Sequence, residues 1–214
     1  MTIINIKVVY NFWYNNKGGN MSKLYFRYGA MNCGKSTALM QVAYNYEANN
    51  KKVCVIKSIV DTKAGDSLES RIGLTRKVDL LLKSGESLEK YYDILKNVDC
   101  ILVDEAQFLE KERVDELFYI TKMFNVPVIC YGLRTDFRSE LFTGSKRLLE
   151  LADELEELIT ICRCGKRAKF NGRYVNDEFT LDGETVKIDG SDDVVRYVPL
   201  CGKCYLEEIE KRKN

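Results

Sequence analysis

The chain has 214 residues, of which 45% are hydrophobic and 30% are charged. This composition is typical of a soluble globular protein and argues against the disordered and membrane classes. The formal net charge of +1 gives no overall basic field, which argues against binding nucleic acid or anionic lipid by bulk charge. Histidine is absent, which excludes Ser-His and Cys-His nucleophiles and histidine metal ligands, so a general base must be a carboxylate, Lys, Tyr or Cys.

Residues 1–20 combine one short apolar run with an Asn-rich tail that contains glycine. The run has no basic flank and no A-x-A site, so it is a poor secretory signal, and it is too short to span a bilayer. Met21 offers a second plausible start. We therefore predict a disordered N-terminal extension or an upstream start codon, in preference to a functional arm, and no contact with a membrane.

Between residues 21 and 160, short apolar runs alternate with helical patterns. Four continuous apolar runs have the length of strands buried on both faces of a parallel sheet: 23–28, 52–57, 100–105 and 126–132. Four helices are predicted from the spacing of apolar residues: 36–49, 87–96, 110–124 and 140–151. This alternation predicts a three-layer α/β domain with a parallel central sheet and right-handed crossovers.

The first predicted strand is followed by the spacing Gly29-x-x-x-x-Gly34-Lys35-Ser36. Between a strand and a helix this spacing predicts a P-loop, in which backbone N–H groups surround phosphates, Lys35 contacts the β- and γ-phosphates and Ser36 binds Mg²⁺. The alternative is a turn that caps a helix by chance, which the flanking strand and helix disfavour. The predicted ATP-binding residues are Gly29, Ala30, Met31, Asn32, Cys33, Gly34, Lys35, Ser36 and Thr37.

A second part of such a site is an acidic residue at the end of a neighbouring strand. Asp104 follows four apolar residues in "ILVDEAQFL" (101–109), at the carboxyl end where ligands bind in open α/β sheets. We expect it to hold Mg²⁺ through water. The adjacent Glu105 orients water if the protein is a hydrolytic ATPase, or accepts a proton from an alcohol if it is a kinase. The structural alternative for Glu105 is an acidic residue at the start of a helix.

From about residue 161 to residue 214, short β-like runs and Gly and Asp turn signals predict a second, smaller lobe. Two close cysteine pairs lie in it, Cys162 with Cys164 and Cys201 with Cys204, and four thiolates complete a closed, structural zinc site. Two alternatives remain open: free thiols, and a zinc ribbon for nucleic acid. The insert between the pairs is rich in acidic residues, a poor match to a phosphate backbone.

The three cysteines at positions 54, 100 and 130 lie inside apolar runs, where a thiol is a small core residue.

Together, several motifs resemble the zinc-ribbon thymidine kinases, a RecA-like family with bacterial members, from about residue 23 to residue 205. They are "YGAMNCGKSTAL" (28–39), "SRIGL" (70–74), "VDEAQFL" (103–109), "CYGLRTDFRSELFTGS" (130–145), "CRCGKRA" (162–168), "YVPLC" (197–201) and "CGKCY" (201–205). The resemblance implies transfer of the ATP γ-phosphate to the 5′-hydroxyl of thymidine, with Glu105 as general base. It also implies Mg²⁺ held with Ser36, Asp104 and Asp61, and structural Zn²⁺ on the four cysteines.

In that family the insert between the cysteine pairs acts as a lasso that folds over the base. The positions that match the nucleoside pocket are Met31, Phe108, Leu133, Phe137, Phe142 and Tyr197. Aromatic rings suit a flat base, although each ring taken alone is more often a core residue, and it is their clustering near Glu105 that favours a pocket. The resemblance further implies a cytoplasmic homotetramer that binds ATP and thymidine, no nucleic acid, and feedback inhibition by dTTP.

Three features depart from the family pattern. The sequence Asp61-Thr62-Lys63 has lysine where the family has arginine, the stretch 188–197 carries extra residues, and Asp189 replaces a glycine. Arg71 and Arg134 are candidates for neutralising phosphate charge. The competing class is a RecA-like ATPase or nucleic-acid-binding module that uses the zinc lobe for contact.

Overall fold

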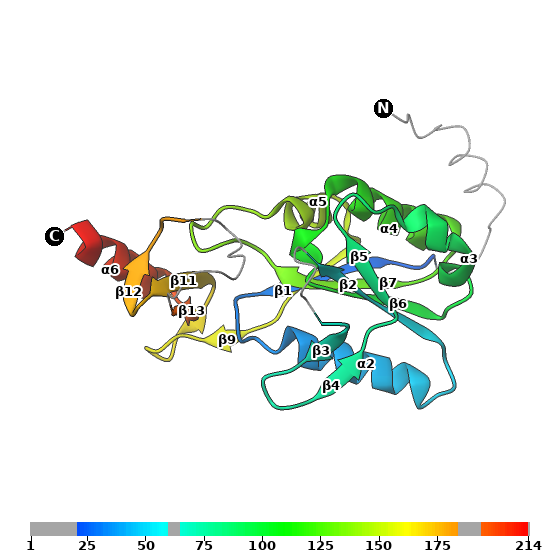
Figure 1. The fold of residues 1–214 in the computed structure, drawn as a ribbon, viewed down its shortest axis with the longest axis horizontal. Helices are drawn as coiled ribbons and strands as arrows, with labels where there is room; N and C mark the ends of the chain where they lie inside the picture. The colour runs from blue at the N-terminus through cyan, green and yellow to red at the C-terminus, as the bar shows by residue number, and fades with distance from the viewer. Residues whose placement is uncertain (1–20, 60–64, 184–193, 214) are drawn as a thin grey trace.

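The computed structural model describes residues 21–59, 65–183 and 194–213. Within these residues the larger lobe is built on a six-stranded sheet with the order β5-β2-β6-β7-β1-β8 (Figure 1). Its strands, which all pair in parallel, are β1 (Leu24–Gly29), β2 (Val53–Ile59), β5 (Leu80–Lys83), β6 (Cys100–Asp104), β7 (Val128–Leu133) and β8 (Glu154–Glu157). The prediction of an α/β domain with a parallel central sheet is therefore confirmed.

Helices cover both faces of this sheet and make three layers (Figure 1). One face packs against α2 (Lys35–Glu47), and the other packs against α4 (Lys111–Met123) and α5 (Thr143–Leu151). Successive residues of β6 alternate between the two cores, since Cys100 and Leu102 pack on the α2 side while Ile101 and Val103 pack on the α4 side. A strand buried on both faces reads as one continuous apolar run, which is why the sequence predicted it.

Two strands of the sheet, β5 and β8, were absent from the sequence prediction. The β8 strand lies at the edge of the sheet, and three of its four residues are glutamate. Charged residues on an edge strand discourage pairing with another chain, but they also remove the apolar pattern that identifies a strand. The register between β1 and β8 comes from tertiary pairing, with Tyr25 opposite Glu154.

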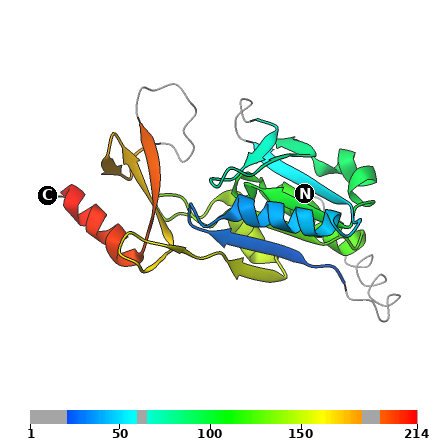
Figure 2. The same cartoon turned by 90° about the horizontal axis from the view of Figure 1, so that it is seen from below.

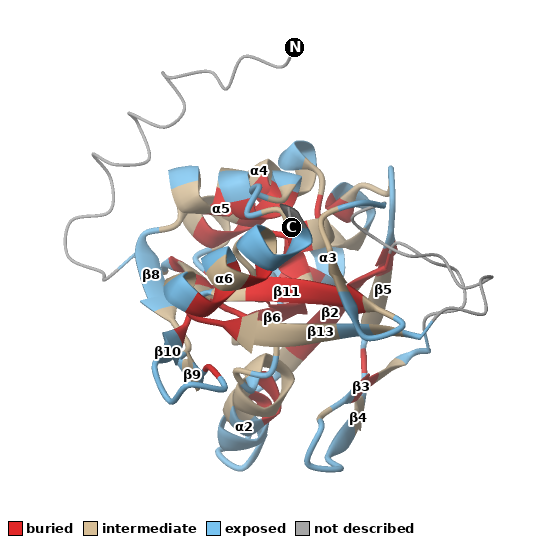
Figure 3. Ribbon diagram, turned by 90° about the vertical axis from the view of Figure 1, so that its left-hand side faces the viewer, coloured by how far each residue is buried: buried red, intermediate tan, exposed pale blue. Residues whose placement is uncertain are grey.

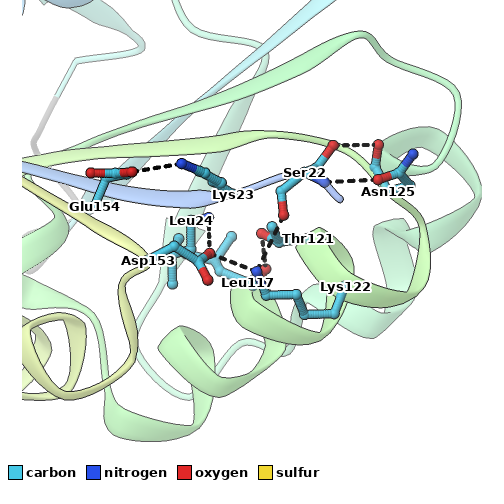
Figure 4. Close-up of polar contacts among 9 residues, drawn as sticks. All are labelled: Ser22, Lys23, Leu24, Leu117, Thr121, Lys122, Asn125, Asp153 and Glu154. Atoms are coloured by element: carbon cyan, nitrogen blue, oxygen red, sulfur yellow. Dashed lines mark hydrogen bonds and ion pairs between the residues drawn. The ribbon is translucent and has the colours of Figure 1, made fainter. Parts of the chain in front are cut away.

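Polar contacts fasten the amino end of β1 to its neighbours (Figure 4). Asp153 accepts hydrogen bonds from the N–H of Leu24 at 2.7 Å and from Lys122 Nζ at 2.6 Å. Ser22 donates to Asn125 through its N–H and through its hydroxyl, both at 2.8 Å. This edge is opposite the carboxyl ends of the strands, so these contacts position β1 without entering the candidate site.

Shorter elements complete the larger lobe. They are the hairpin of β3 (Ser67–Glu69) and β4 (Thr75–Lys77), the single turns η1 (Leu88–Tyr91) and η2 (Ala106–Phe108), and α3 (Tyr92–Leu95). The predicted helix at 87–96 is thus two short turns. Among the helices of the described residues, none combines the length and the apolar character needed to cross a membrane.

The smaller lobe follows β8 and lies to one side of the larger lobe (Figure 2). Its elements are β9 (Thr160–Ile161), β10 (Arg167–Ala168), β11 (Phe170–Val175), β12 (Glu178–Thr180), β13 (Val195–Leu200) and α6 (Gly202–Lys213). Strands β12, β11 and β13 form an antiparallel sheet in that order. The lobe has its own core, which includes Leu200 and Tyr205, and buried residues continue along β11 (Figure 3).

Candidate functional site

The phosphate loop runs from the end of β1 to the start of α2, as its motif predicted. Gly29 has no room for a side chain, because a Cβ atom there would lie 2.5 Å from both Cys33 Sγ and the backbone oxygen of Leu158. Gly34 adopts a left-handed conformation, with φ of 79°, immediately before the helix, and as a glycine it has no side chain that could cap the helix. The first turn of α2 is therefore left with free N–H groups, the arrangement that suits an anion.

Side chains of the loop meet Asp104 at the carboxyl end of β6. The Ser36 hydroxyl donates to Asp104 Oδ2 at 3.3 Å, and Lys35 Nζ donates to the backbone oxygen of Ala30 at 3.2 Å. Burial, followed by the charge of the adjacent Glu105, raises the pKa of Asp104 to about 6. A buried carboxylate beside a hydroxyl offers hard oxygen ligands, and a divalent cation would stabilise its charged form. The donor set thus fits Mg²⁺.

Glu105 has an unusual backbone conformation, with φ of 52° and ψ of 35°. The left-handed region is uncommon for a residue with a side chain, and such strain clusters at functional positions. The carboxylate of Glu105 accepts a hydrogen bond from Gln107 Nε2 at 2.5 Å. It is half-buried, in contrast to Asp104.

Gln107 was not singled out from the sequence, yet the structure makes it part of the site. Its side chain is 1% exposed and is held from both ends, because its Oε1 accepts the N–H of Leu133 at 2.9 Å while its Nε2 holds Glu105. Gly132 makes room for it, since a Cβ there would lie 2.8 Å from Gln107 Oε1. Its place two residues after Glu105 was the one signal that the sequence offered, but a polar residue in a turn is usually exposed.

The residues predicted to contact a nucleoside lie in different environments. Phe108 and Phe142 pack edge to face, with ring centroids 5.6 Å apart. Leu133 and Tyr197 are half-buried, as is Met31 in the phosphate loop. Each of these five side chains retains exposed surface, and contact with a base stays a prediction.

Phe137 differs from the other predicted pocket residues because it is 1% exposed. The guanidinium groups of Arg138 and Arg173 each lie 4.9 Å from the centre of its ring. Its backbone oxygen accepts the Tyr205 hydroxyl at 2.5 Å, which ties it to α6. The ring is thus packed between residues of both lobes, and a direct contact of Phe137 with substrate stays a prediction.

The two cysteine pairs come together in the smaller lobe. Their four Sγ atoms lie within 4.8 Å of one another, and those of Cys164 and Cys201 are 3.5 Å apart. In a tetrahedral zinc centre with Zn–S distances of about 2.3 Å, sulfurs lie about 3.8 Å apart. For Cys162, burial favours the neutral thiol, but the N–H groups of Cys164 and Cys201 together with the thiols of Cys164 and Cys204 outweigh it and lower its pKa to about 7. The spacing of the four thiols and the donor set they offer fit zinc.

Several predicted residues lie outside the described residues or away from the loop. Asp61 and Lys63 fall in 60–64, and most of the predicted lasso tip falls in 184–193, both beyond the described part of the chain. Arg71 is exposed in the turn between β3 and β4, and Arg134 is half-buried after β7. A role for either arginine stays a prediction.

The parallel sheet, the phosphate loop after β1 and the buried carboxylate at the end of β6 define a P-loop nucleotide-binding protein of the RecA-like class. The family model described as thymidine kinase matches residues 22–205. The chain belongs to this family, whose enzymes are ATP-dependent phosphotransferases.

Curated relatives agree with the family model. A thymidine kinase of Mannheimia succiniciproducens is 42% identical over 198 residues, which cover 91% of this chain and 100% of the relative. One of Listeria monocytogenes is 44% identical over 189 residues, covering 86% and 97%. A solved structure of the replication initiator DnaA bound to AMPPCP and single-stranded DNA matches with a TM-score of 0.41 at 16% identity. The match covers 75% of this chain and 48% of the DnaA chain. A likeness at that level carries no argument about function.

Proposed function

We propose that this chain transfers the γ-phosphate of ATP to the 5′-hydroxyl of thymidine for pyrimidine deoxynucleotide salvage, with deoxyuridine as a further candidate acceptor. The observation that carries the proposal is the juxtaposition of phosphate loop and carboxylates, with Ser36 3.3 Å from Asp104 and Glu105 next in the chain. Membership of the thymidine kinase family supports the choice of acceptor.

In the proposed reaction, the N–H groups of residues 29–37 and the Lys35 ammonium bind the phosphates of ATP. Ser36 and Asp104, with Asp61 from the segment outside the described residues, would hold Mg²⁺, which neutralises phosphate charge when bound. Glu105 accepts the proton of the 5′-hydroxyl. The hydroxyl oxygen then forms a bond to the γ-phosphorus while the bond to the oxygen bridging the β-phosphate breaks, giving thymidine monophosphate and ADP.

Gln107 gives a physical reason why Glu105 is suited to this task. Its hydrogen bond fixes one oxygen of the carboxylate, Oε2, and leaves Oε1 to meet the sugar hydroxyl. A base held in one orientation loses less freedom when the substrate binds. The same glutamine binds the N–H of Leu133, so the base and one wall of the proposed nucleoside pocket share a single support.

The proposed nucleoside pocket combines the edge-to-face pair Phe108 and Phe142 with Met31, Leu133 and Tyr197. Apolar and aromatic surface suits the flat thymine ring, and nearby peptide groups can match its carbonyls and N3–H. The four cysteines, Cys162, Cys164, Cys201 and Cys204, would hold Zn²⁺ as a closed centre that keeps the lasso anchored at its base. The cytoplasmic location, the homotetramer and the inhibition by dTTP belong to the same proposal and follow from the family resemblance alone.

The decisive experiment measures ADP production from Mg-ATP with thymidine, deoxyuridine, deoxycytidine or no acceptor. We expect turnover with thymidine, formation of its 5′-monophosphate in equal amount to ADP, and little ADP without an acceptor. Equal ADP production with and without a nucleoside would refute the kinase proposal and favour the competing ATPase. A matched titration with single-stranded DNA should leave the rate unchanged.

A further inference from the structure

Two side chains of the smaller lobe contact the phosphate loop: Thr160 on β9, whose hydroxyl donates to the backbone oxygen of Asn32 at 3.3 Å, and the more deeply buried Asn171 on β11. Asn171 is 3% exposed. Its Oδ1 accepts the backbone N–H of Met31 at 2.8 Å, and its Nδ2 donates to the backbone oxygen of Thr135 at 3.0 Å. These partners are 140 and 36 residues away along the chain. One amide thus joins the metal-binding lobe to two loops of the ATP-binding lobe.

The chemistry of this junction selects an amide. Met31 offers an N–H, which needs an acceptor, and Thr135 offers a carbonyl, which needs a donor. A carboxamide supplies both groups in one plane, whereas an aliphatic side chain of similar size supplies neither. Leaving the buried carbonyl of Thr135 and the half-buried N–H of Met31 without partners costs more than the bonds contribute when they are made. Asn171 therefore helps to hold both loops in their present positions.

Both loops belong to the proposed active site. Met31 lies between the two glycines of the phosphate loop, and Thr135 follows β7 two residues after Leu133. Thr135 is 7% exposed and forms a β-bridge with Leu141, so its turn leads directly toward Phe142. A shift of Asn171 would consequently move a phosphate-binding segment and a nucleoside-binding segment together.

Asn171 is in turn held by the strand that leads into the cysteine centre. In the register of β11 and β13 it lies opposite Pro199, and the chain continues from there to Leu200 and Cys201. The Leu200 side chain packs closely on β11, within 2.7 Å of where a Cβ of Gly172 would be. A short and well-packed path therefore runs from the thiolates to the phosphate loop.

We propose that Asn171 is a positioning residue through which the cysteine centre sets the phosphate loop, so that loss of the centre weakens Mg-ATP binding as well as nucleoside binding. The part of this inference that concerns nucleoside binding rests on the proposed function. The part that concerns Mg-ATP binding rests only on the P-loop fold and on the two hydrogen bonds of Asn171. A purely structural role in the smaller lobe would lower stability without changing the affinity of folded protein for ATP.

The test uses full-length protein in a double-mutant cycle, with equilibrium binding of Mg-ATP measured by calorimetry in the absence of nucleoside. Asn171→Leu removes both hydrogen bonds at similar volume, and Asn171→Ser is a milder variant that leaves space for water. We expect Asn171→Leu to weaken Mg-ATP binding about tenfold, with Asn171→Ser between it and the unaltered protein. Zinc content should stay unchanged in both variants.

Cys201→Ser supplies the other arm of the cycle. We expect it to weaken Mg-ATP binding on its own, and the double variant with Asn171→Leu to be no weaker than the worse single variant. The matched control is Thr121→Val. Thr121 is as deeply buried as Asn171, with 0% exposure, but its hydroxyl donates to the backbone oxygen of Leu117 within α4 and makes no contact between the two lobes. This variant should lower the melting temperature and leave Mg-ATP affinity unchanged.

Full Mg-ATP affinity in folded Asn171→Leu and Asn171→Ser would overturn the proposal. It would also be overturned if the Kd of the double variant rose by the product of the increases measured for Asn171→Leu and Cys201→Ser alone, because the two residues would then act independently. Full affinity in zinc-free Cys201→Ser would overturn it as well. The binding measurement requires no phosphoryl transfer, so it remains readable even if thymidine proves not to be the acceptor. A failure of the kinase proposal is therefore distinguished from a failure of this one.

Discussion

Gln107 Nε2 donates to Glu105 Oε2 at 2.5 Å, and the same glutamine accepts the N–H of Leu133 through Oε1. Gln107 thus joins the carboxylate of Glu105, just after β6, to the backbone of Leu133 at the end of β7. Since β6 and β7 are neighbouring parallel strands, this bridge lies at the carboxyl edge of the sheet, where the phosphate loop also begins.

Replacing Glu105 by glutamine should leave Mg-ATP binding nearly intact and lower kcat for thymidine phosphorylation by about two to four orders of magnitude, because the proton acceptor is lost. Steady-state kinetics measures the rate, and calorimetry with Mg-ATP provides the control. A variant that phosphorylates thymidine at near the original rate would remove Glu105 from the role of general base.

Replacing Gln107 by leucine should lower kcat about tenfold while the KM for ATP stays within about twofold, because Glu105 loses its support but the phosphate loop does not. The buried N–H of Leu133 also loses its acceptor, so a fall in melting temperature is expected. Kinetics of the folded fraction separates the two effects. An unchanged kcat in folded protein would show that Glu105 needs no such support.

Gly29→Ala should abolish measurable Mg-ATP binding, because the new Cβ would lie 2.5 Å from Cys33 Sγ and from the Leu158 oxygen, and the loop must move. Gly65→Ala is the matched control, since its Cβ would meet nothing nearer than Ser67 Oγ at 3.8 Å. Equilibrium binding compares the two. Equal ATP affinity in the two variants would contradict the proposed close packing of the loop.

The purified protein should contain one zinc ion per chain, and Cys201→Ser should lose it and raise the KM for thymidine, because the closed four-thiolate centre is incomplete. Elemental analysis measures the metal. Cys54→Ala is the control, since Cys54 is a buried core thiol in β2 outside the cluster. A zinc-free unaltered protein with full activity would refute the metal assignment.

The ion pair of Glu47 and Arg76 should make the free energy of unfolding depend on pH. Two hydrogen bonds from Arg76, at 2.7 and 2.9 Å, lower the pKa of Glu47 below its ordinary value. A lowered pKa in the folded state means that the stabilisation is present above the unfolded value and is lost as pH falls through the folded one. Because Glu47 is 43% exposed, we expect less than about 1 kcal/mol.

The measurement is the free energy of unfolding of the unaltered protein and of Glu47→Gln between pH 3 and pH 7. The two curves should differ at neutral pH and converge at the acid end. A constant difference across this range would show that the carboxylate charge is not the source of the stabilisation.

Features encoded in contiguous residues could be predicted from the sequence alone. The phosphate loop, the strand that ends at Asp104 and the two cysteine pairs are each local patterns, because backbone geometry or metal coordination requires particular residue types at short spacing. Continuous apolar runs likewise indicated four of the six strands of the sheet. The edge strand β8 escaped because its composition is acidic.

What only the tertiary structure decided are the contacts between distant residues. The burial of Phe137 between two arginines, the double hold on Gln107 and the junction at Asn171 all depend on partners in other elements. A hydrogen bond between residues 140 positions apart leaves no periodic or compositional signal, because its partner on one side is a backbone group that every residue carries. Sequence therefore determined which groups can do the chemistry, and the packing of the two lobes determined which groups hold them in place.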